Sequence, residues 1–198
     1  MKMRRASRFI WATTILAWLW VAPALATAHG VGDPLRAQHP MVQGGELVAT
    51  GNTYGLVVQR EDGSWRWTPE EVLGGSPRVW LRTRQGRVLA GTDQGLWSSG
   101  DGGCSWTPVH DNLREETVTG LGFRARTGAI WASTEAPAGG SIWRRGEEGG
   151  WARVPTGRED VLWERLEVGP FVYAQGLDRD EGQRALLVYR EEAWRPIE

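Results

Sequence analysis

Tryptophans recur along the chain at nearly equal intervals, and this spacing constrains the fold more than any other feature. Trp67, Trp106, Trp151 and Trp194 each close a similar segment, with intervals of 39, 45 and 43 residues. Periods of about 40 to 50 residues are typical of repeat architectures in which each unit is a small group of short strands. The sequence therefore predicts four units, at roughly residues 29–69, 70–109, 110–155 and 156–198.

Within the units, apolar and polar residues alternate with a period of two, as in half-buried β-strands. With 27 Gly and 10 Pro, the chain has many tight turns, which favours an all-β fold. The first unit lacks a clear opening strand, because residues 30–44 are irregular and contain two prolines, and Glu70–Val72 is expected to form a single helical turn. The predicted strands are residues 79–81, 88–91, 95–98 and 105–109, then 118–123, 129–133, 141–144 and 151–154, then 162–166, 171–174, 185–189 and 193–196.

The second unit contains a turn motif that the other units repeat only in part. Its residues have the pattern S-x-D-x-G-x-S-W, formed by Ser99, Asp101, Gly103, Ser105 and Trp106. Short Asp and Ser side chains accept hydrogen bonds from nearby backbone N–H groups, and glycine adopts the positive φ that such turns need. The first unit aligns with it, placing Asp62 on Asp101 and Trp67 on Trp106, whereas units three and four retain only acidic turns.

This motif resembles the Asp-box of sialidase-type (BNR) repeats, with Ser105 where threonine is commoner. The resemblance implies a β-propeller repeat of about four blades, that is, a partial or small propeller. It also implies that Ser99, Asp101, Gly103, Ser105 and Trp106 serve the fold, on the rim opposite the active site of sialidases. Propellers similar to photosystem II assembly factors are a neighbouring resemblance.

The chain begins with a pattern typical of an export signal. Basic residues precede an apolar run from Phe9 to Ala26, and A-x-A cleavage sites end at Ala26 and Ala28, so residues 1–28 are predicted to be removed. The domain of residues 29–198 would then be secreted or periplasmic, and an uncleaved membrane anchor is the alternative. Cleavage after Ala28 would leave His29 at the N-terminus of the mature chain. His29 is then interpreted as an incidental first residue, and the alternative is that it binds copper together with His39 or His110.

Charge and cysteine content exclude several classes of function. The chain has 23 basic and 24 acidic residues, and removal of the four basic residues of the leader leaves 19 against 24, a net charge of −5. A negative net charge argues against nucleic acid and anionic membrane surfaces as partners. The single cysteine, Cys104, cannot form an internal disulfide.

Candidate catalytic groups do not form a recognisable set in the sequence. Sialidases similar in motif carry a tyrosine–glutamate pair, but this chain has only three tyrosines (Tyr54, Tyr173 and Tyr189). The acidic pairs 70–71 and 115–116 are interpreted as solvated turns, and the segment 178–182, which faintly resembles a calcium loop, as a polar hairpin tip. We therefore predict no catalytic residues, no metal site and no cofactor.

The loops between second and third strands differ in length among the units. They are short at residues 51–54 and 92–94 but longer at 134–140 and 176–184, which is a signal of a binding face, with neutral drift as the alternative. The sequence thus favours a non-enzymatic module for recognition or assembly, with an unknown protein or glycan as partner. The alternative is a fragment of a sialidase-like, carbohydrate-active hydrolase.

Ring closure is left open by the sequence. Four units are compatible with a small closed ring, with half of a larger ring made by two chains, or with an open arc. An open arc would bare the outer faces of its two end units and drive self-association, with Leu47, Val48, Leu162 and Phe171 as the candidates for exposure.

Overall fold

The structure is a computed structural model, which describes residues 38–43, 46–52, 54–109, 113–146 and 149–197. The predicted leader, its cleavage sites, His29 and His110 lie outside the described residues. No helix among the described residues is both long and apolar enough to span a membrane.

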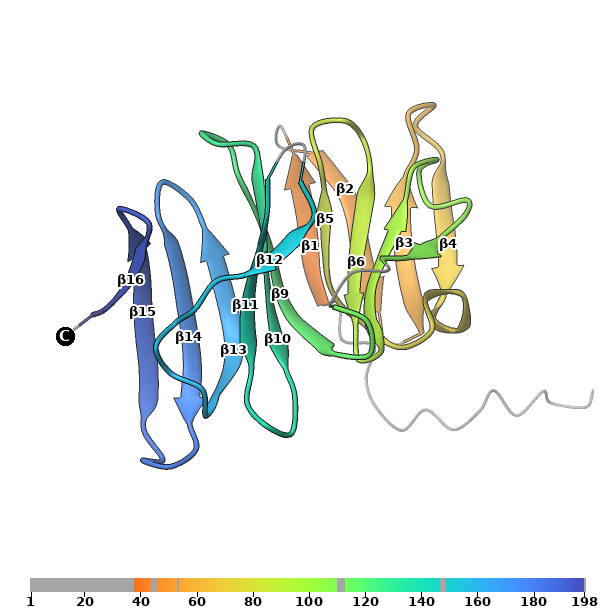
Figure 1. Cartoon of the computed structure of the whole chain (residues 1–198). Coiled ribbons are helices and arrows are strands. Elements are labelled where there is room, and N and C mark those ends of the chain that lie inside the picture. The colour runs from red at the N-terminus through yellow and green to blue at the C-terminus, as the bar shows by residue number, and fades with distance from the viewer. Residues whose placement is uncertain (1–37, 44–45, 53, 110–112, 147–148, 198) are drawn as a thin grey trace, which may run out of the picture. The chain divides into compact units, whose positions relative to one another are not determined.

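The described chain forms four antiparallel sheets of four strands each, and the strands of every sheet follow one another in the sequence (Figure 1). This confirms the all-β prediction and fits a partial β-propeller. The sheets consist of β1 (Gln38–Gln43), β2 (Glu46–Asn52), β3 (Gly55–Gln59) and β4 (Trp65–Pro69); β5 (Pro77–Arg82), β6 (Val88–Thr92), β7 (Gly95–Ser99) and β8 (Thr107–Pro108); β9 (Thr117–Arg124), β10 (Ala129–Glu135), β11 (Ser141–Arg145) and β12 (Trp151–Arg153); and β13 (Val161–Val168), β14 (Val172–Asp178), β15 (Arg184–Arg190) and β16 (Ala193–Pro196).

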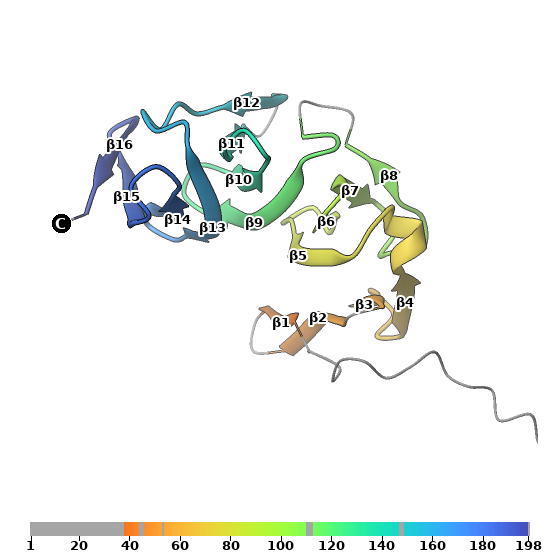
Figure 2. The ribbon, with the colours of Figure 1, turned by 90° about the horizontal axis from the view of Figure 1, so that it is seen from below.

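Consecutive sheets contact each other chiefly through their first strands, with β5 against β1, β9 against β5 and β13 against β9 (Figure 2). Each junction between consecutive sheets encloses one apolar cluster, and these three clusters form the core. Gly122 of β9 is needed for this approach, because a Cβ atom there would lie 2.2 Å from a methyl carbon of Val168 in β13. The interior is therefore a series of layers between sheets.

The strands predicted in the last three units are all present, although β8 is shorter than expected because Ser105 belongs to the turn. The expected turn after the first sheet is a 3-10 helix, η1 (Glu70–Leu73), which ends at Gly74. The expectation of no opening strand in the first unit is wrong, since β1 includes Pro40. Proline fits there because β1 is an edge strand of its sheet, and its pairing with β2 has two register shifts.

Two of the four residues expected to lie on bare end faces are exposed, namely Leu47 and Phe171, while Leu162 is half-buried. The expectation for Val48 is wrong, because its side chain is 7% exposed. Successive strand residues point to opposite faces, so Leu47 and Val48 cannot both lie on the same bare face.

Candidate functional site

The turn between β7 and β8 is held by the Asp101 carboxylate. One of its oxygens accepts hydrogen bonds from the backbone N–H groups of Cys104 and Ser105, both at 2.9 Å, and from the Ser99 hydroxyl at 2.8 Å. The other oxygen accepts from the Ser105 hydroxyl at 2.5 Å. These donors, the Ser105 hydroxyl first, hold the pKa of Asp101 well below its ordinary value, because they stabilise the ionised form. The carboxylate is thus fully engaged within its own turn.

Ser99 and Gly103 complete this turn. The Ser99 hydroxyl oxygen accepts a hydrogen bond from the Gly103 N–H at 2.8 Å, and the Ser99 side chain is fully buried. Gly103 has a φ of 89°, a conformation that favours glycine over other residues. The five residues of the motif therefore form one hydrogen-bonded unit at the surface end of the second sheet.

Trp106 links this turn to the first sheet. Its indole N–H donates to the Thr68 hydroxyl and to the Gly103 carbonyl, both at 3.2 Å, and the Thr68 hydroxyl also donates to the Gly103 carbonyl. The Trp106 side chain is 9% exposed and packs in the cluster that contains Leu56 and Val58 of β3. The motif therefore joins two consecutive sheets.

The first sheet contains a reduced version of the same turn, in which Ser64 donates to Asp62 from both its N–H (2.9 Å) and its hydroxyl (2.5 Å). The sequence alignment of Trp67 with Trp106 is wrong. Val57 in β3 pairs with Trp67, and the corresponding residue of β7, Trp97, pairs with Pro108. The residue two positions earlier is Trp65 in the first sheet and Trp106 in the second, so these two are equivalent.

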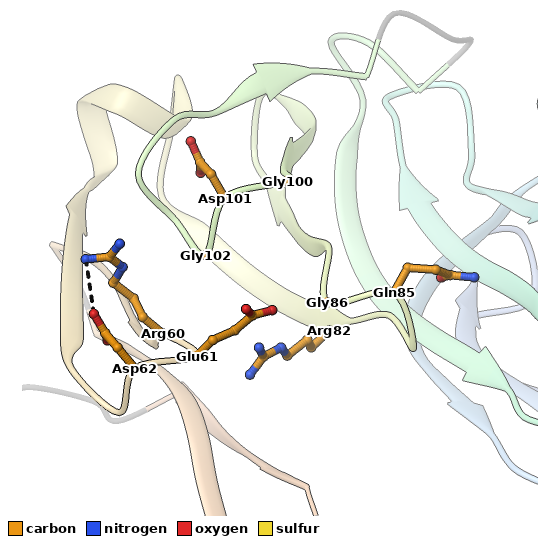
Figure 3. A pocket seen from close by; sticks show the side chains of 9 residues that line it. All are labelled: Arg60, Glu61, Asp62, Arg82, Gln85, Gly86, Gly100, Asp101 and Gly102. Atoms are coloured by element: carbon orange, nitrogen blue, oxygen red, sulfur yellow. Dashed lines mark ion pairs between the residues drawn. The ribbon is translucent and has the colours of Figure 1, made fainter.

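A polar cleft of about 360 Å³ lies beside the Asp101 turn, at what we call the box end (Figure 3). Figure 3 shows Glu61 and Arg82 reaching into the space between their turns, with Arg60 paired to Asp62 at 3.7 Å. Hydrogen bonds from Ser64 lower the pKa of Asp62. The hydrogen bonds within the Asp101 turn likewise lower the pKa of Asp101. Both carboxyl groups therefore favour the ionised form, whereas a general acid needs a raised pKa. The lining residues are Arg60, Glu61, Asp62, Arg82, Gln85, Gly86, Gly100, Asp101 and Gly102.

The two lengthened loops lie together at the opposite end of the strands, which we call the loop end (Figure 1). The loop after β14 reaches the loop after β10, because the Arg179 guanidinium donates a hydrogen bond to the Pro137 carbonyl. The Arg179 N–H also donates to the Asp160 carbonyl at 3.1 Å, in the segment that leads into β13. Three connections from two sheets are therefore fastened together by one arginine.

A second cleft, of about 390 Å³, lies at the loop end and is lined by residues 140–142 and 153–159. Arg158 from this lining forms an ion pair with Asp178 at 3.2 Å. The other Asp178 oxygen accepts hydrogen bonds from the N–H groups of Asp180 and Glu181, both at 3.1 Å. The segment 178–182 is thus a capped hairpin tip, and the described residues contain no cluster of three or more potential metal-ligating His, Cys, Asp or Glu side chains.

The other candidates from the sequence lie apart from these clefts. Tyr54 is exposed beside the first sheet, Tyr173 is half-buried in β14, and Tyr189 is buried in β15, where burial raises its pKa. Glu70 accepts a hydrogen bond from Ser76. Arg158 and Arg179 were missed by sequence reasoning, because the only signal for them was the length of the loops that they join.

Comparison with known proteins identifies the fold. No known family and no curated protein matches the sequence. Among solved structures, the GH74 xyloglucanase from Xanthomonas campestris is similar, with 18% identity, a TM-score of 0.53, and 76% of this chain and 28% of that chain covered. The extracellular domain of a proposed hybrid two-component system from B. thetaiotaomicron is also similar, with 15% identity, a TM-score of 0.56, and 75% and 20% coverage.

A further match is a proposed gluconolactonase, with 12% identity, a TM-score of 0.52, and 75% of this chain and 58% of that chain covered. The xyloglucanase and the extracellular domain are β-propeller proteins. The chain has the fold of a partial β-propeller. It spans between a fifth and three-fifths of the length of these three structures. At these identities the similarity concerns the fold alone, so membership of the Asp-box repeats and the resemblance to photosystem II assembly factors stay predictions.

Proposed function

We propose that this chain is a recognition module of the β-propeller type, that it works outside the cytoplasm, and that it binds its partner at the loop end without turnover. The observation that carries the proposal is the fastening of the two lengthened loops by Arg179, next to the loop-end cleft. Loops that are held on a rigid scaffold are where binding residues concentrate in repeat proteins. The partner is a protein or a glycan.

The charged groups support a binding role. The Asp101 carboxylate is used within its turn, and the pKa values of Asp62 and Asp101 are shifted downwards, opposite to the direction that a glycosidase acid requires. At the loop end, Arg158 is paired with Asp178, which fixes the cleft wall. The alternative, a fragment of a carbohydrate-active hydrolase, shares the fold with the xyloglucanase described above.

The binding site is tested with Arg179→Ala, which removes the link between the loops. We expect purified protein to bind on a glycan array or to capture a protein from the secreted or periplasmic fraction, and Arg179→Ala to weaken that binding about tenfold or more. Arg60→Ala, which alters the box end, is the matched control and should retain binding. Binding lost in Arg60→Ala but kept in Arg179→Ala would place the site at the other end, and turnover of aryl-glycosides would favour the hydrolase.

Export is tested separately, because it rests on the leader pattern in the sequence. N-terminal sequencing of protein collected outside the cytoplasm should begin at Thr27 or His29. Recovery of the intact N-terminus from the membrane fraction would support the uncleaved anchor instead.

A further inference from the structure

One tryptophan occupies the same place in every sheet, as the strand pairing shows. In the four sheets, Val57 pairs with Trp67, Trp97 with Pro108, Trp143 with Arg153 and Leu187 with Pro196. The residue two positions before the second member of each pair is always tryptophan. We call these the closing tryptophans: Trp65, Trp106, Trp151 and Trp194.

Three closing tryptophans pack against the preceding sheet. Trp106 lies in the cluster of Leu56 and Val58 from β3, and Trp151 in the cluster of Leu96 from β7. Trp194 packs on the cluster of Ile142 and Trp131, with its ring 6.0 Å from that of Trp131 in an edge-on arrangement. Each junction between consecutive sheets is thus built by one closing tryptophan and one apolar residue of the preceding third strand.

The closing tryptophan of the first sheet has no such neighbour among the described residues. Trp65 is 47% exposed and Trp67, which lies on the same face two residues later, is 54% exposed. By contrast, Trp106 and Trp151 are 9% and 6% exposed. Two large aromatic side chains on one bare sheet face are typical of an interaction surface.

The last sheet carries the complementary feature. The residues that receive the closing tryptophans are Leu56, Leu96 and Ile142, which are at most 1% exposed. The backbone carbonyls of Leu96 and Ile142 accept hydrogen bonds from Val109 and Val154, and in the last sheet the carbonyl of Leu186 accepts one from Ile197. Leu186 is therefore the equivalent residue, yet Leu186 and Ile197 are 40% and 39% exposed.

We propose that two copies of this chain associate, with Trp65 of each copy packing on Leu186 and Ile197 of the other. Both halves of the contact are exposed among the described residues of a single chain. A two-fold symmetric pair uses each half twice and leaves neither bare. The pair contains eight sheets, which is within the four to eight blades of known propellers.

The test compares oligomeric state by size-exclusion chromatography with light scattering over a range of protein concentrations. The exported protein should have twice the mass of one chain, and Trp65→Arg and Leu186→Asp should each have the mass of one chain. Val72→Asp is the control, because Val72 is 46% exposed in η1, outside both surfaces, and should leave the dimer intact. Far-ultraviolet circular dichroism verifies that each variant is folded.

Mixing the two variants separates a specific contact from general stickiness. In a one-to-one mixture, Trp65→Arg and Leu186→Asp chains form one unaltered junction and one junction with an Arg–Asp pair, so the dimer mass should return. Wild-type protein that is monomeric at every concentration would overturn the proposal and leave the surface to a different protein. Dimers that persist in both variants, or assemblies that grow without limit, would also contradict it. If Trp65→Arg fails to fold, Leu186→Asp alone decides between monomer and dimer.

Discussion

Asp101 lies at the surface, yet both of its carboxylate oxygens accept hydrogen bonds from the same short turn. The acidic residue therefore has a structural role in this turn, because its oxygens act as acceptors for the backbone N–H groups of the turn. The hydroxyl groups of Ser99 and Ser105 also donate to this carboxylate, which favours its ionised form. At the scale of single residues, the motif is thus a turn stabilised by hydrogen bonds to an ionised carboxylate.

The charge state of Asp101 should be measurable as a dependence of stability on pH. Its pKa in the folded protein is below the ordinary value of 3.8, so its contribution is full above that pH and is lost as pH falls below 3.8 towards the folded value. The difference in melting temperature between wild type and Asp101→Asn should therefore be largest near neutral pH and shrink below about pH 4. A difference that grows in acid would contradict the hydrogen-bonded arrangement.

The two equivalent tryptophans, Trp65 and Trp106, should differ strongly in their effect on stability. Replacement of the buried Trp106 by alanine is expected to lower the free energy of unfolding by about 3–5 kcal/mol, as for other large aromatic side chains in cores. Trp65→Ala should lower it by less than about 1 kcal/mol in dilute solution, because Trp65 is already half exposed. Urea denaturation at low protein concentration measures both, and equal losses would contradict the assignment of the junction.

At the scale of elements, most strands could be predicted from the sequence because each is a short, mainly apolar run between turn-forming residues. Burial alternates along β9, as the period of two predicts, whereas all five residues of β6 are buried because its sheet has a neighbour on each face. β1 was missed because Pro40 interrupts the pattern and the strand pairs irregularly with β2. The equivalence of Trp65 and Trp106 was missed because the sequence W-T-P occurs in both units and aligns Trp67 with Trp106. The strand pairing shows that the two W-T-P segments lie at different registers.

The candidate binding site was predictable only in outline. Loop lengths indicated the loop end, but the contact between Arg179 and Pro137 joins residues 42 positions apart and leaves no local pattern. The exposure of Leu186 and Ile197 could not be predicted either, because it depends on whether another sheet packs against them and not on the neighbouring sequence.

The turn between β15 and β16 offers a test of local backbone strain. Glu191 and Glu192 have φ values of 51° and 64°, as in a type I′ hairpin turn, although glutamate does not favour this conformation. Glu191→Asn is expected to raise the free energy of unfolding by about 0.5–1 kcal/mol, because asparagine tolerates the left-handed region. Glu61→Asn, in an exposed turn with negative φ, serves as the control in the same thermal denaturation experiment and should change stability little.

At the scale of the whole molecule, stability should vary along the chain. Within the described part of the chain, sheets two and three are covered on both faces by neighbouring sheets, whereas the first and last sheets each pack against a neighbouring sheet on one face only. In repeat proteins each unit is stabilised mainly by its immediate neighbours. In the monomeric Leu186→Asp variant, amides of β2–β3 and β14–β15 should exchange hydrogen roughly tenfold faster than those of β6–β7 and β10–β11. Uniform exchange across the four sheets, measured by mass spectrometry, would show that the chain opens as a single unit.

Every sheet has a closing tryptophan on the face towards the preceding unit and an apolar residue of its third strand on the face towards the following unit. The three junctions are therefore built from the same pair of contacts. A copy of one 40-residue stretch, inserted by gene duplication, would meet its neighbours through contacts that already exist on both sides. Growth of the chain by one unit therefore requires no new kind of side-chain contact. In the third and fourth units, where only an acidic turn remains of the motif, Trp151 and Trp194 still pack against the preceding sheet.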